Sequence, residues 1–400
     1  MSSPAHSEPP SSSSPESSQE PALVAVSTPA PALTDSQKMS VSQRLKVLRT
    51  RYSQLEAILF FAAGFTFDAV MLDRIDDELM LWQQIVYLAV AGLVLAYTFR
   101  HEMTGWHPPA WMAKPWKYSE HLLHFMLGTL LNAYTLFYFK AASGPVAVLF
   151  LVLIGCLLAI NEMPIFHKMG PVVVMGIFSY ALTSYFGYLI PVLEGSIRVW
   201  MFLTAVFLAV LCMAPLFYFV ERWRGRNEAI IKVGVPGATV QLIILALYLL
   251  HAIPPVPLAL ESIGVYHKVD HTRGGPWRLS MQEPSGLIRR HGDTTFQARK
   301  GDKIHVFVRI FAPRGFRDRI FMRWFFQDPT RGWIQTDPIR LTIADREERG
   351  YPTFSTKANY QPGKWRVEVQ TEDGRTVGEQ TFTVVDDDST TPRDFVVEEG

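Results

Sequence analysis

The two halves of the chain differ in the spacing of their hydrophobic positions. Residues 55–253 consist mostly of long apolar runs, while residues 273–386 alternate between apolar and polar side chains. An apolar run of about 20 residues is long enough to cross a bilayer as a helix, and a period of two is typical of strands with one buried face. The pattern predicts a membrane α-helical bundle followed by an all-β, immunoglobulin-like sandwich.

Seven apolar runs are candidate membrane spans. Asp68 interrupts the first run, and three prolines at positions 254, 255 and 257 follow the last one. Because proline lacks the backbone donor that a helix interior needs, these prolines are predicted to end the seventh helix. The runs lie near residues 55–72, 81–99, 120–140, 144–160, 171–193, 198–220 and 237–253.

Lys and Arg are divided unequally between the loops that join these spans. The segment before the first span and the alternate loops after it hold thirteen, whereas the loops on the opposite side hold three. Short loops rich in Lys and Arg stay in the cytoplasm, so we expect the N-terminus there. An odd number of spans then predicts that the β domain lies outside the cytoplasm.

The β half contains the sequence signals of a sandwich. The run KIHVFVRIF places apolar side chains at 304, 306, 308 and 310 on one face. Asp373–Gly374 lies between two alternating runs and predicts a hairpin. We expect seven to nine short strands within about 110 residues, with Trp324 and Trp365 as core aromatic residues.

Composition divides the chain into six segments. Ser and Pro dominate the N-terminal segment, which cannot bury enough apolar surface to fold alone, and basic residues alternate with apolar ones in the next. The expected segments are a disordered cytoplasmic tail (1–40), a basic amphipathic interfacial helix (41–54), the transmembrane domain (55–253), a Pro-containing juxtamembrane joint (254–272), the β-sandwich (273–386) and an acidic tail (387–400).

Several stretches carry a resemblance to a known family. IPPVPLALESIGVYH, RWFF, the Arg-Gly-Tyr at 349–351 and GKWRVEVQTEDGRTVGEQTFTV resemble the DUF2914 family, and the membrane half resembles the DUF5924 domain that accompanies it. These are uncharacterised bacterial membrane proteins. The resemblance implies a multi-pass protein of the bacterial inner membrane with a periplasmic β domain, and it supplies no catalytic residue or substrate.

Polar residues in and beside the apolar runs are candidates for chemistry. His121 and His124 lie three apart on one helix face, a spacing that could hold zinc or iron, with an interfacial polar cluster as the alternative. Asp68, Asn132 and Glu162 lie within or at the ends of spans, where ionisable and polar residues mark functional sites unless water reaches them. No metal or other cofactor is predicted.

The formal net charge of +1 conceals an arginine-rich stretch in the β half. Residues 273–349 hold sixteen basic and nine acidic side chains, and arginine suits bidentate contacts with phosphate or carboxylate. We expect Arg314, Phe316, Arg317 and Arg319, with Trp333, to contact an anionic glycan, an anionic lipid or a periplasmic protein. The alternative is a solvated charged face, partly paired with the acidic tail.

Two hypotheses follow from these observations. In the first, the protein is not an enzyme: the bundle lies among membrane lipids and displays a sandwich that binds an envelope component, in a structural or sensory role. In the second, a transporter or membrane enzyme has its site in the bundle, with Asp68, His124, Asn132 and Glu162 around one cavity. The sequence contains no nucleophile or phosphate-loop motif, and the basic surplus outside the cytoplasm argues against nucleic acid.

Overall fold

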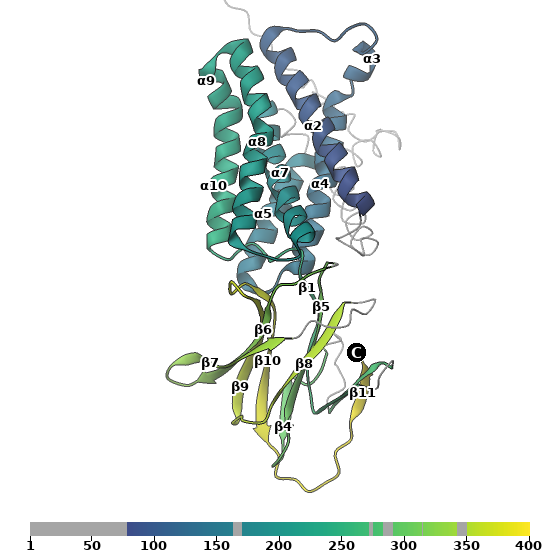
Figure 1. Cartoon of the computed structure of the whole chain (residues 1–400), viewed down its shortest axis with the longest axis vertical. Helices are drawn as coiled ribbons and strands as arrows, with labels where there is room; N and C mark the ends of the chain where they lie inside the picture. The colour runs from purple at the N-terminus through teal and green to yellow at the C-terminus, as the bar shows by residue number, and fades with distance from the viewer. Residues whose placement is uncertain (1–77, 163–169, 272–274, 283–290, 314, 342–349) are drawn as a thin grey trace, which may run out of the picture. The chain divides into compact units, whose positions relative to one another are not determined.

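The computed structural model describes residues 78–162, 170–271, 275–282, 291–313, 315–341 and 350–400 (Figure 1). The expected tail, interfacial helix and first span, with Asp68, lie outside the described residues. The described residues belong to one compact unit. Within it, a helical region is followed by a β-sandwich.

Five described helices are long and apolar enough to cross a membrane, in agreement with five of the seven predicted spans. The fourth predicted span is a helix whose described apolar part, Ala147–Leu158, is shorter, so the count of seven is not confirmed. The helices are α2 (Glu78–Thr104), α3 (Ala113–Trp116), α4 (Ser119–Ala141), α5 (Gly144–Glu162), α7 (Pro171–Glu194), α8 (Val199–Arg224), and the continuous helix of α9 (Arg226–Ala229), the π-helical turn η1 (Ile230–Gly234) and α10 (Val235–Leu249).

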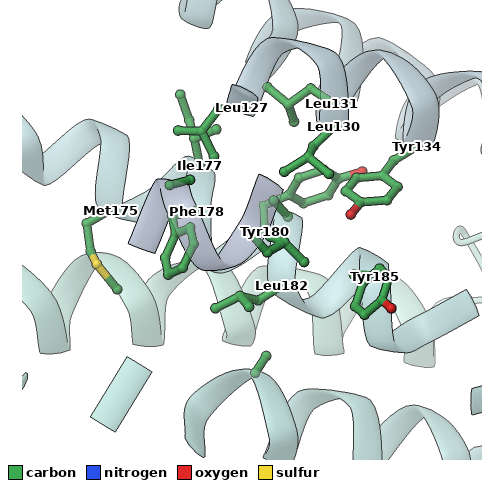
Figure 2. Packing of buried hydrophobic residues seen from close by; sticks show 14 of the residues in the cluster. Leu127, Leu130, Leu131, Tyr134, Met175, Ile177, Phe178, Tyr180, Leu182 and Tyr185 are labelled. Carbon is green, nitrogen blue, oxygen red and sulfur yellow. The ribbon is translucent and has the colours of Figure 1, made fainter. Parts of the chain in front are cut away.

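Helix α7 is the centre of the bundle. It contacts α2, α4, α5, α8 and α10, and 67% of its apolar window is buried, against 22–28% for α2, α8 and the helix at 226–249. Figure 2 shows its Ile177 and Phe178 packed in the same buried cluster as Leu127 and Leu130 of α4. Helices α2 and α7 also lie close together. A small residue on α2 allows this, because a Cβ atom added at Gly92 would lie 3.0 Å from the Phe178 ring.

Neutral hydrogen bonds join α7 to its neighbours. The side-chain amide of Gln241 on α10 donates to Thr183 Oγ1 at 2.6 Å and to Ser179 Oγ at 2.9 Å. The Tyr188 hydroxyl donates to Gln84 of α2. In a bilayer, such buried polar side chains find partners on other helices because lipid offers none.

Helix α10 ends before the prolines that were predicted to end it. Its last residue is Leu249, and His251 has a positive φ of 55°. The left-handed conformation at His251 turns the chain out of the helix. The prolines then lie in the connection into the first strand, which turns at Val256 and Pro257 and has a cis peptide between these two residues.

Two sheets form the sandwich, and a small third sheet lies beside it. Neighbouring strands are antiparallel except β4 and β10, which are parallel. In sheet order, the first sheet is β1 (Ala259–Tyr266), β5 (Ile304–Phe311) and β8 (Tyr351–Lys357). The second is β4 (Thr295–Ala298), β10 (Thr376–Asp386), β9 (Gly363–Thr371), β6 (Ile320–Asp328) and β7 (Gly332–Leu341). The third is β11 (Val396–Glu399), β3 (Trp277–Met281) and β2 (Lys268–His271).

The core between the two large sheets agrees with the sequence pattern. The predicted inward positions of β5 at 304, 306, 308 and 310 are all fully buried. Trp324 and Trp365 are buried and meet edge to face at 6.4 Å. The predicted hairpin at Asp373–Gly374 joins β9 to β10, and Gly374 has the positive φ that such turns require.

The β structure extends beyond both ends of the expected sandwich. Strand β1 begins at Ala259 inside the expected joint, and β11 lies inside the expected acidic tail. A register shift between Leu260 and Ser262 breaks the alternation of β1, which explains why the pattern did not reveal it. The joint between bundle and sandwich is therefore short.

Candidate functional site

The sandwich contacts the helical region at loops and ends that share one side of the bundle. Ser143, between α4 and α5, donates a hydrogen bond to the carbonyl of Thr376 at 3.1 Å. Further contacts come from the turn between α7 and α8 and from the end of α10. By the loop charges, this is the side that the sequence predicts to lie outside the cytoplasm.

Arg375 of the sandwich caps the last helix. Its side chain is 4% exposed and bonds Asp373 Oδ2 at 2.8 Å. The guanidinium donates to the carbonyls of Tyr248 at 3.2 Å and Ile253 at 3.4 Å, and it lies 3.6 Å from the centre of the Tyr248 ring. A cation at a helix C-terminus satisfies orphan carbonyls and the helix dipole together, so Arg375 couples α10 to the β9–β10 hairpin.

The loop before β6 rests on the turn between α7 and α8. The backbone N–H of Arg317 donates to the Gly195 carbonyl at 2.7 Å, and the Asp318 carboxylate accepts from the Ile197 N–H at 2.9 Å. Gly195 has a φ of 66°, and a Cβ there would lie 2.4 Å from the Gly315 carbonyl oxygen. Glycine is therefore required where the two segments meet.

A groove of about 720 Å³ lies beside this contact. We call it the junction groove. Four arginines and three carboxylates line it, together with Ile197 and Val199: Arg198, Arg317, Arg319, Arg340, Asp318, Glu372 and Asp373.

The carboxylates of the junction groove have partners within the protein, whereas most of its guanidinium groups form no ion pair with a described residue. Asp318 accepts two backbone N–H groups, Glu372 lies 3.4 Å from Arg319, and Asp373 is bound to Arg375. No ion pair joins the remaining three arginines to another residue that the structure describes: Arg198, Arg317 and Arg340. All three are exposed, so the groove offers unpaired positive charge to an anion.

Only part of the expected arginine loop is available to a ligand. Arg317 and Arg319 line the junction groove. Phe316, expected at the surface, is instead 9% exposed and packs in the sandwich core. Trp333 lies on β7 with Arg366 4.7 Å from its ring centre, away from the groove lining. Arg314 lies outside the described residues.

Of the polar residues expected in the bundle, the structure describes the side chains of His124 and Asn132, and neither lines the small cavity found there. Between the bundle and the joint is a cavity of about 40 Å³, lined among others by Tyr138, Tyr180, Ser184 and Arg375. This volume holds a few water molecules at most. His124 and Asn132 belong to α4 but do not line it, Glu162 is the last residue of α5, and Asp68 lies outside the described residues.

The two histidines of α4 find no further metal ligands among the residues that the structure describes. His121 is exposed and His124 is half-buried near the start of the helix. Within those residues, no group of three His, Cys, Asp or Glu side chains could hold an ion. The predicted pair alone is too small a ligand set for a zinc or iron site.

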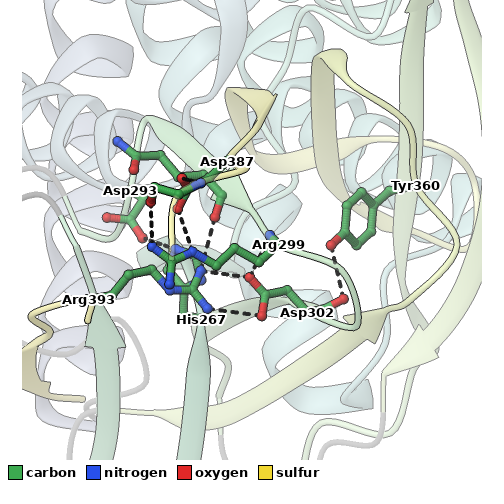
Figure 3. Close-up of polar contacts among 9 residues, drawn as sticks. His267, Asp293, Arg299, Asp302, Tyr360, Asp387 and Arg393 are labelled. Carbon is green, nitrogen blue, oxygen red and sulfur yellow. Dashed lines mark hydrogen bonds and ion pairs between the residues drawn. The ribbon is translucent and has the colours of Figure 1, made fainter. Parts of the chain in front are cut away.

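Ion pairs join the sandwich to its C-terminal segment, as Figure 3 shows. Arg393 makes a bidentate ion pair with Asp302 at 2.7 and 3.0 Å, and Arg299 lies 2.6 Å from Asp387. Hydrogen bonds from Ser389 and Arg299 lower the pKa of Asp387 to about 2. Part of the basic surplus is thus paired with the tail, and the tail is part of the folded domain.

His267 is buried next to this network. Its ring stacks on Phe296 at 4.0 Å, and its Nε2 atom lies 3.6 Å from Asp293 Oδ2. Burial and the nearby positive charge of Arg393 lower the pKa of His267 to about 4. With this pKa the ring is neutral at pH 7, where it packs against Phe296.

Sequence reasoning missed Arg198, Arg340 and Arg375. Arg198 lies at the first position of a predicted span, next to a loop otherwise poor in basic residues, which was a usable signal. Arg375 follows the hairpin Asp373–Gly374, where a charged residue ordinarily indicates solvent. Nothing in the sequence indicates that it reaches a helix end.

These features define a class of protein: helices able to cross a membrane, followed by a β-sandwich fastened to their ends. The family model described as "Protein of unknown function (DUF2914)" matches residues 317–384. This confirms the DUF2914 part of the resemblance, while the DUF5924 part remains a prediction. No curated protein matches the chain.

Two solved structures are similar to parts of the chain. An immunoglobulin-like protein from Pseudomonas aeruginosa has 12% identity and a TM-score of 0.20, with 32% of this chain and 98% of that chain covered. The Pseudomonas fluorescens alkylpurine DNA glycosylase AlkC, bound to DNA containing an abasic site analog, has 9% identity and a TM-score of 0.21, with 76% and 98% covered. TM-scores this low carry no argument about fold or function.

Proposed function

We propose that this protein is a multi-pass bacterial inner-membrane protein that holds a periplasmic β-sandwich against the outer ends of its helices. The sandwich binds an anionic envelope component, in a structural or sensory role. The junction groove carries the proposal, because its Arg198, Arg317 and Arg340 are exposed and form no ion pair with described residues. Arginine presents a planar fork of donors that matches phosphate and carboxylate.

The contacts around the groove support a sensory variant of this role. Arg375 joins the β9–β10 hairpin to the end of α10, and Asp318 joins the loop before β6 to the turn ahead of α8. An anion bound between Arg198 and Arg340 would touch both the helical region and the sandwich. Binding would therefore favour the arrangement in which the two are closed together.

Cysteine labelling in intact spheroplasts tests the orientation on which this function depends. Cys156 and Cys212 are first replaced by alanine, and one cysteine is introduced at Arg331 of the β6–β7 turn or, as a matched control, at Asn227 after α8. Both positions are exposed. Helix α8 has 26 residues, a length of about 39 Å, so Asn227 lies at the opposite membrane face from the sandwich.

We expect a membrane-impermeant maleimide to label Arg331→Cys in intact spheroplasts and Asn227→Cys only after permeabilisation. The reverse result would place the sandwich in the cytoplasm and overturn the envelope partner. Transport or membrane enzymology remains the alternative function, but the cavity of about 40 Å³ is too small for most solutes.

A further inference from the structure

The residues that line the junction groove indicate its depth relative to the bilayer. Helix α8 begins at Val199, and Arg198 is its N-cap residue. Both residues line the groove. Since the apolar run of α8 starts immediately after Arg198, the groove lies where hydrocarbon gives way to lipid headgroups.

Exposed apolar side chains next to the groove agree with this depth. Leu193 at the end of α7, Val199 and Trp200 are 73%, 45% and 50% exposed. Leucine and valine on the outside of a membrane bundle face acyl chains, and tryptophan is enriched at the level of the headgroups. An anion in the groove would therefore have lipid chains directly beside it.

The two walls of the groove come from different parts of the fold. Arg198 belongs to the helix, while Arg317 and Arg340 belong to the loop before β6 and to β7. A phosphate diester that entered this groove sideways from the leaflet would have guanidinium groups on both walls, while its acyl chains stayed in the bilayer. A soluble glycan would reach the same groups only from the water side.

We propose that the junction groove binds the headgroup phosphate of an anionic phospholipid from the outer leaflet of the membrane that holds the helices. Arg198, Arg317 and Arg340 contact the phosphate. The bound lipid bridges the end of the helical region and the sandwich, and so stabilises their contact. This inference rests on the proposed function and names the chemical class of its partner.

Lipid retention by the full chain tests the proposal. The protein is reconstituted in nanodiscs of phosphatidylcholine with a minor share of phosphatidylglycerol, and bound phosphatidylglycerol is measured by native mass spectrometry. The test variant is Arg198→Gln/Arg340→Gln. The matched control is Arg331→Gln, which removes an exposed arginine on the same domain that does not line the groove.

We expect the double variant to bind phosphatidylglycerol about tenfold more weakly, because charge-assisted hydrogen bonds to the phosphate are lost. Arg331→Gln and the binding of phosphatidylcholine should not change. Arg198→Lys/Arg340→Lys keeps the charge but loses the planar fork, and should fall between wild type and the glutamine variant. Soluble glycerol phosphate should not displace the lipid, because it lacks acyl chains.

Three outcomes would overturn the lipid assignment. One is unchanged phosphatidylglycerol binding in the double glutamine variant, and another is an equal loss in Arg331→Gln, which would indicate unspecific surface charge. The third is a soluble anionic glycan whose binding depends on Arg198 and Arg340 while lipid retention does not. In that case the proposed function would stand. Unchanged far-ultraviolet circular dichroism confirms that each variant is folded.

Discussion

The helical region and the sandwich bury their polar groups in different ways. In the bundle, buried polar contacts join neutral side chains, as between Gln241 and Thr183 or Tyr188 and Gln84. In the sandwich, ion pairs such as Arg393 with Asp302 surround an apolar core. An unpaired charge is costly in lipid because no water solvates it there. At the surface of the sandwich, water solvates such a charge. The difference indicates which solvent each region meets.

The same comparison explains where a ligand site can form. Charged side chains are costly on the lipid side, and several arginines of the sandwich are paired with carboxylates, so the boundary between the two regions is where an unpaired cation can lie next to lipid. Arg198 and Arg340 lie there. Unpaired arginine side chains at this boundary can therefore reach anionic lipid headgroups.

The largest expected effect comes from the sandwich core. Trp324→Ala should lower the free energy of unfolding of the sandwich by about 3–5 kcal/mol, because it removes a fully buried ring and leaves a cavity. The bundle has a separate core cluster and should keep its helical circular dichroism. Limited proteolysis of the sandwich measures the loss.

Trp333→Ala is the control for this change, since Trp333 is only partly buried. Its cost should be about 1 kcal/mol. If the helices of Trp324→Ala melted together with the sandwich, the two regions would form one cooperative unit. Their two cores would then not be independently stable.

A smaller effect concerns the pH dependence of the sandwich. The pKa of His267 is lowered to about 4 by burial and by Arg393, so the unfolded chain binds a proton more readily. The contribution of His267 to the free energy of unfolding is complete above about pH 6.5 and is lost as the pH falls toward 4. The free energy of unfolding should change by about 2 kcal/mol over this range. His305, whose pKa burial also lowers, acts in the same direction.

Denaturant titrations of the sandwich between pH 7 and pH 4 check this dependence. His267→Phe should remove most of the slope in that range, because phenylalanine can keep the stacking on Phe296 without titrating. Lys268→Gln, at a neighbouring exposed position, should leave the slope unchanged. A variant that retained the full slope would assign the pH response to other groups.

The smallest expected effect lies in the bundle. Gln241→Leu removes the hydrogen bonds to Thr183 and Ser179, yet should lower bundle stability by only about 0.6 kcal/mol, the average for hydrogen bonds between membrane helices. Thermal unfolding in detergent measures it, with Thr204→Val as control because the Thr204 hydroxyl donates to the Trp200 carbonyl of its own helix. A loss above about 2 kcal/mol would show that polar contacts dominate bundle packing.

Much of the architecture was predictable because it depends on local pattern. Apolar runs predicted five helices that the structure confirms, and the alternation at 304–310 identified the buried face of β5. The predicted end of the last helix was wrong by a few residues, because the turn at His251 precedes the prolines. Strand β1 was missed because its register shift hides the period of two.

The candidate site was predictable only in part. Two of its arginines, Arg317 and Arg319, belong to the loop that the sequence singled out, but Phe316 turns inward because the core has room for a ring there. Of the arginine-rich stretch, Arg299 is paired with Asp387 of the C-terminal segment, and Arg393 of that segment is paired with Asp302. Whether an arginine is free or paired depends on distances in space.

The sequence by itself determined the five apolar helices and the strands with a regular alternation, such as β5, because hydrophobic burial acts on each of these segments through its own periodicity. Only the tertiary structure decided that Arg198 and Arg340, far apart in the chain, line one groove, and that Arg375 caps a helix of another region. Contacts between such distant residues depend on how whole elements pack, and no local pattern records that packing.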